Sequence, residues 1–204
     1  MTAELLDGLA QALDAAGRLV DGVRDDQWSL PTPCPDWNTR DLVGHIVSGN
    51  RMFASILRRG QPGAGQPGAG QPGADQPGAD LPSAYREAAD ELLAAFGRPG
   101  ILDQMFTVPF GTVPGSVALH LRITELLVHG WDLARATGQP ARFPDGLAER
   151  ELAFSRGALP AIPPGRTPFA PPRPVAADAP AIDQLAALLG RSASRPGTGS
   201  RAPS

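Results

Sequence analysis

The sequence predicts an all-α fold, a four-helix bundle with a low-complexity insert between helices and a short C-terminal extension. Apolar residues recur with the 3.6-residue period of a helix in four long segments. Loops rich in proline and glycine separate these segments, and the last of them is apolar on nearly every side. With 204 residues, the chain suffices for one well-filled domain.

The first half of the bundle follows from periodicity and capping signals. A helix is predicted from Thr2 to about Val23, where apolar residues form one broad face. Residues 26–38 contain three prolines and two tryptophans, which favours an ordered loop anchored by aromatic side chains. The second helix should begin with Asn38 or Thr39 as its N-cap and end near Arg59.

The next segment is a repeat of four pentapeptides, QPGAG, QPGAG, QPGAD and QPGAD, at residues 61–80. Proline and glycine in every unit disfavour both helix and strand, so we predict a flexible, solvated loop. The near-identity of the units suggests repeat expansion in the gene. We therefore expect that deletion of all four units leaves the fold and metal binding intact.

Two more bundle elements follow the repeats. A helix is predicted from Ser83 to Phe96, and residues 101–114 are expected to be irregular or short-stranded. The fourth bundle helix should begin near Gly115 and end at Thr137, because Gly138 and a proline follow.

These elements divide the chain into three parts. Residues 1–140 form the predicted bundle, and residues 141–191 a C-terminal extension that packs on it, with helices at 145–159 and 181–189. Residues 192–204 contain few apolar side chains and are expected to be disordered.

Composition excludes several classes of function. The net charge of −3 and the absence of a basic cluster argue against a nucleic-acid partner. All 18 basic residues are arginine, so the chain has no lysine for Schiff-base chemistry or for a phosphate-binding loop.

Compartment is also suggested by composition. Cys34 is the one cysteine, which excludes an intrachain disulfide and favours a reducing setting. The N-terminal segment is acidic from its start and does not read as a signal peptide, and no run of about 18 apolar residues could cross a bilayer. We expect a cytoplasmic protein, monomeric or homodimeric, without a membrane partner.

The chemistry of the chain centres on Glu125 and His129, one helical turn apart within an apolar helix. A carboxylate removed from water costs several kcal/mol unless it is paired or bound to a metal. A Glu with a His four residues later suits two ligands of one divalent cation. His45, in another helix, is the candidate third ligand, whereas His120 should point away and is interpreted as a surface or packing residue.

Two segments carry a resemblance to a known family. The segment PTPCPDWNTRDLVGHIVSGNRMF, residues 31–53, is followed far downstream by ELLVHGWDLARATGQ, residues 125–139. Together they resemble the DinB-like superfamily and, within it, the mycothiol-dependent maleylpyruvate isomerase N-terminal-domain proteins. The closing segment PVAADAPAIDQLAALLGR, residues 174–191, is similar to the tail of an actinobacterial subgroup that is largely uncharacterised.

The resemblance implies a four-helix bundle that holds a divalent metal, zinc first and nickel as the alternative. Its ligands map onto His45, Glu125 and His129. It also implies mycothiol, or a similar low-molecular-weight thiol, as the co-substrate of an S-transferase or isomerase that acts on a small electrophile. A metal with three protein ligands keeps an open position where a thiol would lose its proton.

Several neighbours of these ligands have two interpretations. Asp132 either hydrogen-bonds a ligand imidazole or is solvated or paired with an arginine. Arg122 and Trp131 are candidate contacts for a substrate, although arginine pairing and packing are the commoner roles. Cys34 is either a small buried apolar residue or a soft ligand.

Three classes of function remain open on the sequence. The first is a metal-dependent thiol transferase or isomerase. The second is a non-catalytic metal-binding bundle, with a link to stress responses. The third is a metal-free structural or interaction protein, which requires Glu125 to pair with an arginine.

Overall fold

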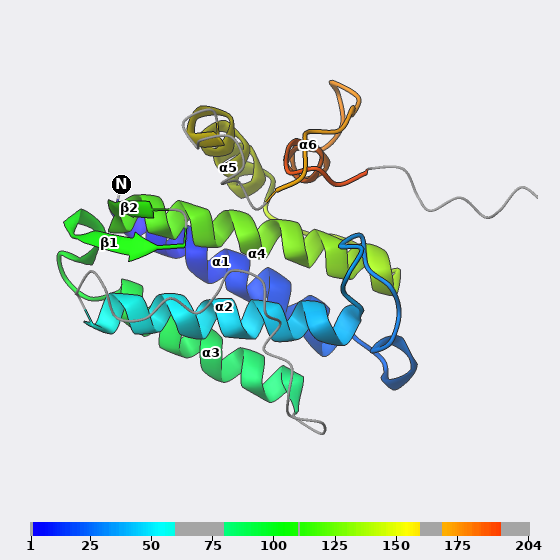
Figure 1. Ribbon diagram of the computed structural model, residues 1–204, viewed down its shortest axis with the longest axis horizontal. Coiled ribbons are helices and arrows are strands. Elements are labelled where there is room, and N and C mark those ends of the chain that lie inside the picture. The colour runs from blue at the N-terminus through cyan, green and yellow to red at the C-terminus, as the bar shows by residue number, and fades with distance from the viewer. Residues whose placement is uncertain (1, 60–79, 110, 160–168, 193–204) are drawn as a thin grey trace, which may run out of the picture.

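The computed structural model describes residues 2–59, 80–109, 111–159 and 169–192. Expectations for the repeats up to residue 79, for residues 160–168 and for the tail after residue 192 lie outside this part of the chain. The elements in order are α1 (Thr2–Asp21), the 3-10 turn η1 (Asp25–Gln27), α2 (Thr39–Arg59), α3 (Leu81–Phe96), the 3-10 turn η2 (Ile101–Asp103), β1 (Met105–Val108), β2 (Gly111–Pro114), α4 (Gly115–Thr137), α5 (Asp145–Ala158) and α6 (Ala181–Leu188), as shown in Figure 1.

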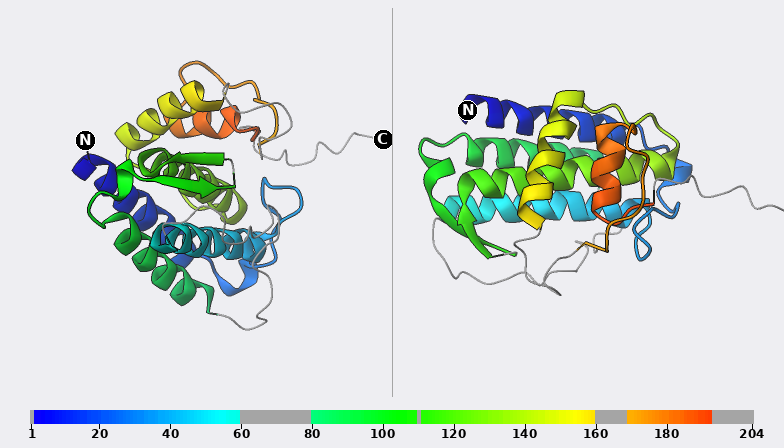
Figure 2. Two further views of the ribbon diagram at one scale, coloured as in Figure 1. Left: turned by 60° about the vertical axis from the view of Figure 1, so that its left-hand side comes forward. Right: turned by 90° about the horizontal axis from the view of Figure 1, so that it is seen from above.

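Helices α1 to α4 form the bundle, and the predicted all-α fold class is confirmed. Helices α1 and α2 each pack against both α3 and α4, so the four helices enclose one apolar core (Figure 1). Helices α5 and α6 lie on the outer side of α4, away from α2 and α3 (Figure 2). Helix α4 is therefore covered on both sides, which explains why its sequence is apolar on nearly every side.

Helices α2 and α3 run in the same direction. Arg51 of α2 pairs with Glu87 of α3 (3.4 Å), and Arg58 pairs with Glu91 (3.2 Å), so residue numbers rise together along the two helices. Consequently α2 ends beside the C-terminal end of α3. The end of α2 and the start of α3 therefore lie about one length of α3 apart.

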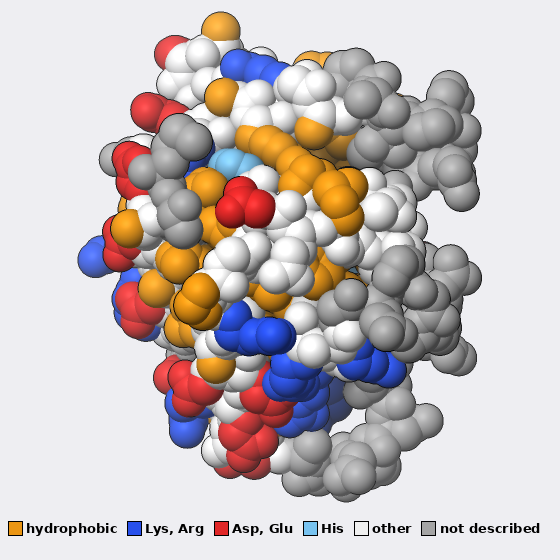
Figure 3. Space-filling view, turned by 90° about the vertical axis from the view of Figure 1, so that its left-hand side faces the viewer, with side chains coloured by type: hydrophobic (Ala, Val, Ile, Leu, Met, Phe, Trp, Pro, Cys, Tyr) orange, Lys and Arg blue, Asp and Glu red, His pale blue; other side chains and the backbone are white. Residues whose placement is uncertain are grey.

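The link from α3 to α4 is short and closes one end of the bundle. Strands β1 and β2 form an antiparallel hairpin in which Phe106 lies opposite Val113. Helix α4 then begins at Gly115, where a Cβ atom would lie 2.1 Å from the carbonyl oxygen of Ile101. On this end face, apolar side chains gather across the middle, with most charged side chains around them (Figure 3). In the described part of the chain, no helix is both long and apolar enough to span a membrane.

The parallel arrangement of α2 and α3 conflicts with the expectation that all four repeat units can be removed. The 16 residues of α3 extend about 24 Å, and an extended chain covers at most about 3.6 Å per residue. Roughly seven residues are thus the minimum for this link. Deletion of residues 61–80 would leave Gly60 alone to join Arg59 to Leu81, which is too short.

We predict that deletion of residues 61–70 changes the free energy of unfolding by less than about 1 kcal/mol, because loop-closure entropy depends weakly on length. Deletion of residues 61–80 should abolish the cooperative monomeric transition or force exchange of helices between chains. Urea unfolding and size-exclusion chromatography measure both effects. A Gly-Ser linker of the original length in place of residues 61–79 is the control, and it should behave like the parent protein.

Candidate metal centre

The loop before α2 brings Cys34 to the bundle. An isolated antiparallel bridge joins Pro31 and Asn38, and the Thr32 hydroxyl lies 3.1 Å from both the backbone N–H and the carbonyl of Cys34. Asn38 caps α2: its Oδ1 accepts from the N–H of Asp41 (3.0 Å), and Asp41 Oδ2 accepts from the N–H of Asn38 (3.1 Å). The proline-rich segment is thus an ordered loop with a fixed exit angle into α2.

His45 and His129 face each other from α2 and α4. Their ring centroids lie 4.9 Å apart at 80°, and the Trp37 ring lies 4.4 Å from His45 and 5.8 Å from His129. Burial, helped by the neighbouring His129 and two arginines, lowers the pKa of His45 to about 3. Near neutral pH His45 is therefore an uncharged imidazole, the form that binds metals.

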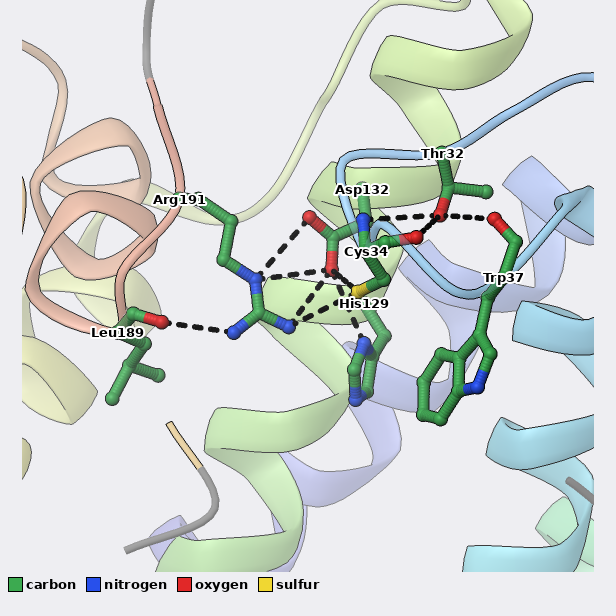
Figure 4. A network of polar contacts seen from close by, with 7 residues as sticks. All are labelled: Thr32, Cys34, Trp37, His129, Asp132, Leu189 and Arg191. Atoms are coloured by element: carbon green, nitrogen blue, oxygen red, sulfur yellow. Dashed lines mark hydrogen bonds and ion pairs between the residues drawn. The ribbon is translucent and has the colours of Figure 1, made fainter. Parts of the chain in front are cut away.

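Asp132 orients the ring of His129. This carboxylate is fully buried, and its Oδ2 lies 3.2 Å from His129 Nδ1. Burial favours the neutral acid, but the His129 hydrogen bond and Arg191 more than offset it, so the pKa of Asp132 is lowered. An ionised carboxylate can only accept a hydrogen bond, so His129 carries a proton on Nδ1. Its Nε2 points away from Asp132 (Figure 4).

Arg191 joins this network from the segment after α6. Its NH2 group donates to Asp132 Oδ2 (3.1 Å) and to Cys34 Sγ (3.4 Å), and NH1 donates to the carbonyl of Leu189 (2.9 Å), as Figure 4 shows. Burial, followed by Asp132, raises the pKa of the Cys34 thiol to about 12, although Arg191 acts in the opposite direction. Cys34 is therefore a thiol that donates to Asp132 Oδ2, 3.3 Å away.

Glu125 has a partner that the sequence argument had left open. Arg122 NH1 donates to Glu125 Oε2 at 2.6 Å, and the Glu125 side chain is 14% exposed. A metal is therefore not required to give this carboxylate a partner. The pairing required by the metal-free interpretation is present, and Oε1 is the oxygen that Arg122 leaves for another ligand.

Trp131 and His120 lie outside this group. Trp131 is 1% exposed and donates from its indole N–H to Asp183 of α6 (2.7 Å), so contact with a substrate would require α6 to move. His120 Nδ1 lies 3.0 Å from Glu151 of α5. Both residues join the extension to α4.

Comparison with known proteins decides the family. The model of the mycothiol maleylpyruvate isomerase N-terminal domain matches residues 9–134, more than half of the chain. The chain belongs to this family. It is 38% identical over 186 residues to the uncharacterized proteins MT0763 and Rv0738 of two strains of Mycobacterium tuberculosis, covering 89% of this chain and 94% of each relative.

Solved structures of the family share the fold. Two crystal structures of the mycothiol-dependent maleylpyruvate isomerase, one with a histidine replaced by alanine, match with a TM-score of 0.58. They are 17% and 16% identical in sequence, and the match covers 75% of this chain and 68% of the isomerase chain.

Two donor sets that share His129 could hold the metal that the sequence suggests. In the described part of the chain, one group of three His, Cys or acidic residues has its ligand atoms within 4.8 Å of one another: Cys34, His129 and Asp132. That group already holds the Arg191 guanidinium, so a metal there would have to displace this cation as well as the Cys34 proton. The second set is formed by His45, His129 Nε2 and Glu125 Oε1. In the described residues its ligand atoms do not all come within 4.8 Å of one another, and Glu125 Oε2 pairs with the Arg122 guanidinium. It offers two imidazoles and one carboxylate oxygen that Arg122 does not hold. Its donor chemistry fits a divalent ion better.

We predict that Arg191→Met lowers the free energy of unfolding of the metal-free protein by roughly 3–5 kcal/mol, because it leaves the buried Asp132 charge without its cation. Adding Asp132→Asn should recover part of this loss. Urea unfolding at neutral pH measures both. The control is Arg135→Met. Its partner Asp183 lies 3.5 Å away, the two side chains are 31% and 23% exposed, and loss of this partly exposed pair should cost less than about 1 kcal/mol. Equal losses of stability for Arg191→Met and Arg135→Met would contradict the role of Arg191 as the cation that compensates the buried Asp132.

Proposed function

We propose that this chain binds one divalent cation through His45, His129 and Glu125, and that it acts on a small electrophile as a thiol S-transferase or isomerase. The observation that carries this proposal is the contact between the imidazoles of His45 on α2 and His129 on α4, whose ring centroids lie 4.9 Å apart. Membership of a family named for a mycothiol-dependent isomerase supports the thiol. Zinc is the first choice of metal because two imidazoles and a carboxylate suit it, and nickel is the alternative.

The residues around the pair have defined tasks in this proposal. Asp132 holds the Nδ1 proton of His129, which keeps Nε2 directed at the cation. Trp37 covers both rings and limits access of water. When bound, the cation would stabilise the thiolate of mycothiol or of a similar thiol at neutral pH. Three protein ligands leave a position for that sulfur.

A second function has one observation in its favour. The ion pair between Arg122 and Glu125 satisfies the carboxylate without a metal, as a structural or interaction protein would require. A non-catalytic metal-binding bundle lies between the two, since it shares the metal and lacks the reaction. Metal content separates the metal-free interpretation from the others, and thiol conjugation separates the transferase from the non-catalytic bundle.

We predict about one divalent ion per chain in protein purified without chelator. His45→Ala and His129→Ala should each remove most of this metal, because each deletes one of two facing imidazoles. Glu125→Ala should weaken metal binding more than Glu125→Gln, which keeps an uncharged oxygen at this position. Elemental analysis after gel filtration gives the content of each variant.

Cys34→Ser separates the two donor sets. It should leave the metal content unchanged if His45 and Glu125 are the ligands. Loss of metal in Cys34→Ser with full content in His45→Ala would move the site to Cys34, His129 and Asp132.

We predict further that mycothiol binds the metal-loaded protein and neither the chelated form nor His129→Ala. The thiolate is the species that binds a metal, so affinity should increase with pH up to the pKa of the thiol. Calorimetry measures binding, and a new sulfur-to-metal absorption band in cobalt-substituted protein reports direct contact. Absence of both signals at millimolar thiol would favour the non-catalytic bundle.

A further inference from the structure

The Arg122 guanidinium is held in a fixed position between α4 and α2. It is fully buried, and it donates from Nε to Asn50 Oδ1 (2.9 Å) and from NH2 to the carbonyl of Ile46 (3.1 Å). At Gly49 a Cβ atom would lie 2.5 Å from Arg122 NH1, so the absence of a side chain there makes room for the guanidinium. These contacts fix the group independently of Glu125.

Glu125 is the carboxylate that balances this buried charge. Arg122 NH1 donates to Glu125 Oε2 at 2.6 Å, the length of a strong charge-assisted hydrogen bond. Burial lowers the pKa of Arg122, and Glu125 acts against that shift. A cation bound between His45 and His129 would draw on the same carboxylate, because Glu125 lies on α4 one turn before His129.

We propose that Arg122 competes with the metal ion for the Glu125 carboxylate. Arg122 pairs with Glu125 when no metal is bound, and this competition sets the affinity for the metal. This inference rests on the proposed function. Repulsion between the fixed guanidinium and a nearby divalent cation acts in the same direction as the competition. The empty bundle is thus a stable, charge-balanced state, and metal loading is an exchange of partners at Glu125.

Stability of the chelated protein tests the first half of this proposal. Arg122→Met and Glu125→Gln should each lower the melting temperature, and the double variant should melt no lower than Glu125→Gln alone, because the pair is then already broken. Additive losses would overturn the proposal. The control is the same double-mutant comparison on a second ion pair of α4, with Arg135→Met and Asp183→Asn. The melting-temperature changes of these variants should be the same with and without metal.

Affinity for Zn²⁺, measured by competition with a chelator, tests the second half. Arg122→Met should bind Zn²⁺ at least 10-fold more tightly than the parent protein. In a Glu125→Gln background the same change should give a gain several-fold smaller. An equal gain in both backgrounds would mean that Arg122 acts only through its charge at a distance, and a weaker affinity in Arg122→Met would mean that it positions Glu125 for the metal. Either result overturns the competition.

Two further outcomes separate this inference from the proposed function. If neither the parent nor Arg122→Met binds Zn²⁺, both fail. If the parent binds Zn²⁺ and Arg122→Met binds no more tightly, the inference alone fails. Should Arg122→Met not fold, Gly49→Ala provides a second variant. Its methyl group would force the guanidinium to shift, while Arg122 and the three ligands are not themselves substituted. It should tighten Zn²⁺ binding in the same direction, and an unchanged or weaker affinity would overturn the inference.

Discussion

The structure depends on a partner for each of the charged side chains that helix α4 buries away from water. This helix is enclosed by the bundle on one side and by α5 and α6 on the other. Its buried or nearly buried polar groups therefore reach across to neighbouring elements: Arg122 to α2, Asp132 to Arg191, and Trp131 to Asp183. A buried charge without such a partner would cost several kcal/mol. The same contacts that hold the extension on the bundle thus also shape the site.

Charge balance in the site follows from this arrangement. Arg122 offsets Glu125, and Arg191 offsets Asp132, so the region around His45 and His129 has little net charge before any ligand binds. A divalent cation held there would keep most of its charge. An anionic fourth ligand would then be favoured on electrostatic grounds, which agrees with a thiolate.

The sequence predicted the elements of the fold well, because each depends on local signals. The predicted start and end of α2 and the end of α3 agree with the structure, and α4 runs from Gly115 to Thr137 as expected. The relative direction of α2 and α3 has no local signal, since it is set by packing across the insert. That is why the expected tolerance to full deletion of the repeats conflicts with the observed topology.

The candidate site was predictable in part for the same reason. Spacing along one helix identified Glu125 and His129 as neighbours. The position of His45 in another helix made it the candidate third ligand, and the family resemblance implied the same three residues. Arg191 had no comparable signal, because an arginine after a terminal helix is commonly a solvated residue, and 59 positions separate it from Asp132. Cys34 and Trp37 were visible as residues of an anchored loop, but their contacts with Asp132 and His45 depend on how that loop folds over the bundle.

The C-terminal extension of this chain contributes directly to the candidate site. The structural match leaves about a third of the isomerase chain without a counterpart here, whereas the mycobacterial relatives are covered almost throughout. In this chain α5 and α6 take the outer face of α4, and the segment after α6 delivers Arg191 to Asp132, which in turn orients His129. Residues near the proposed metal ligands are therefore positioned by this C-terminal segment. In the proposed function, the bundle provides the metal and thiol site, and the residues that the extension places beside it contribute to the choice of electrophile.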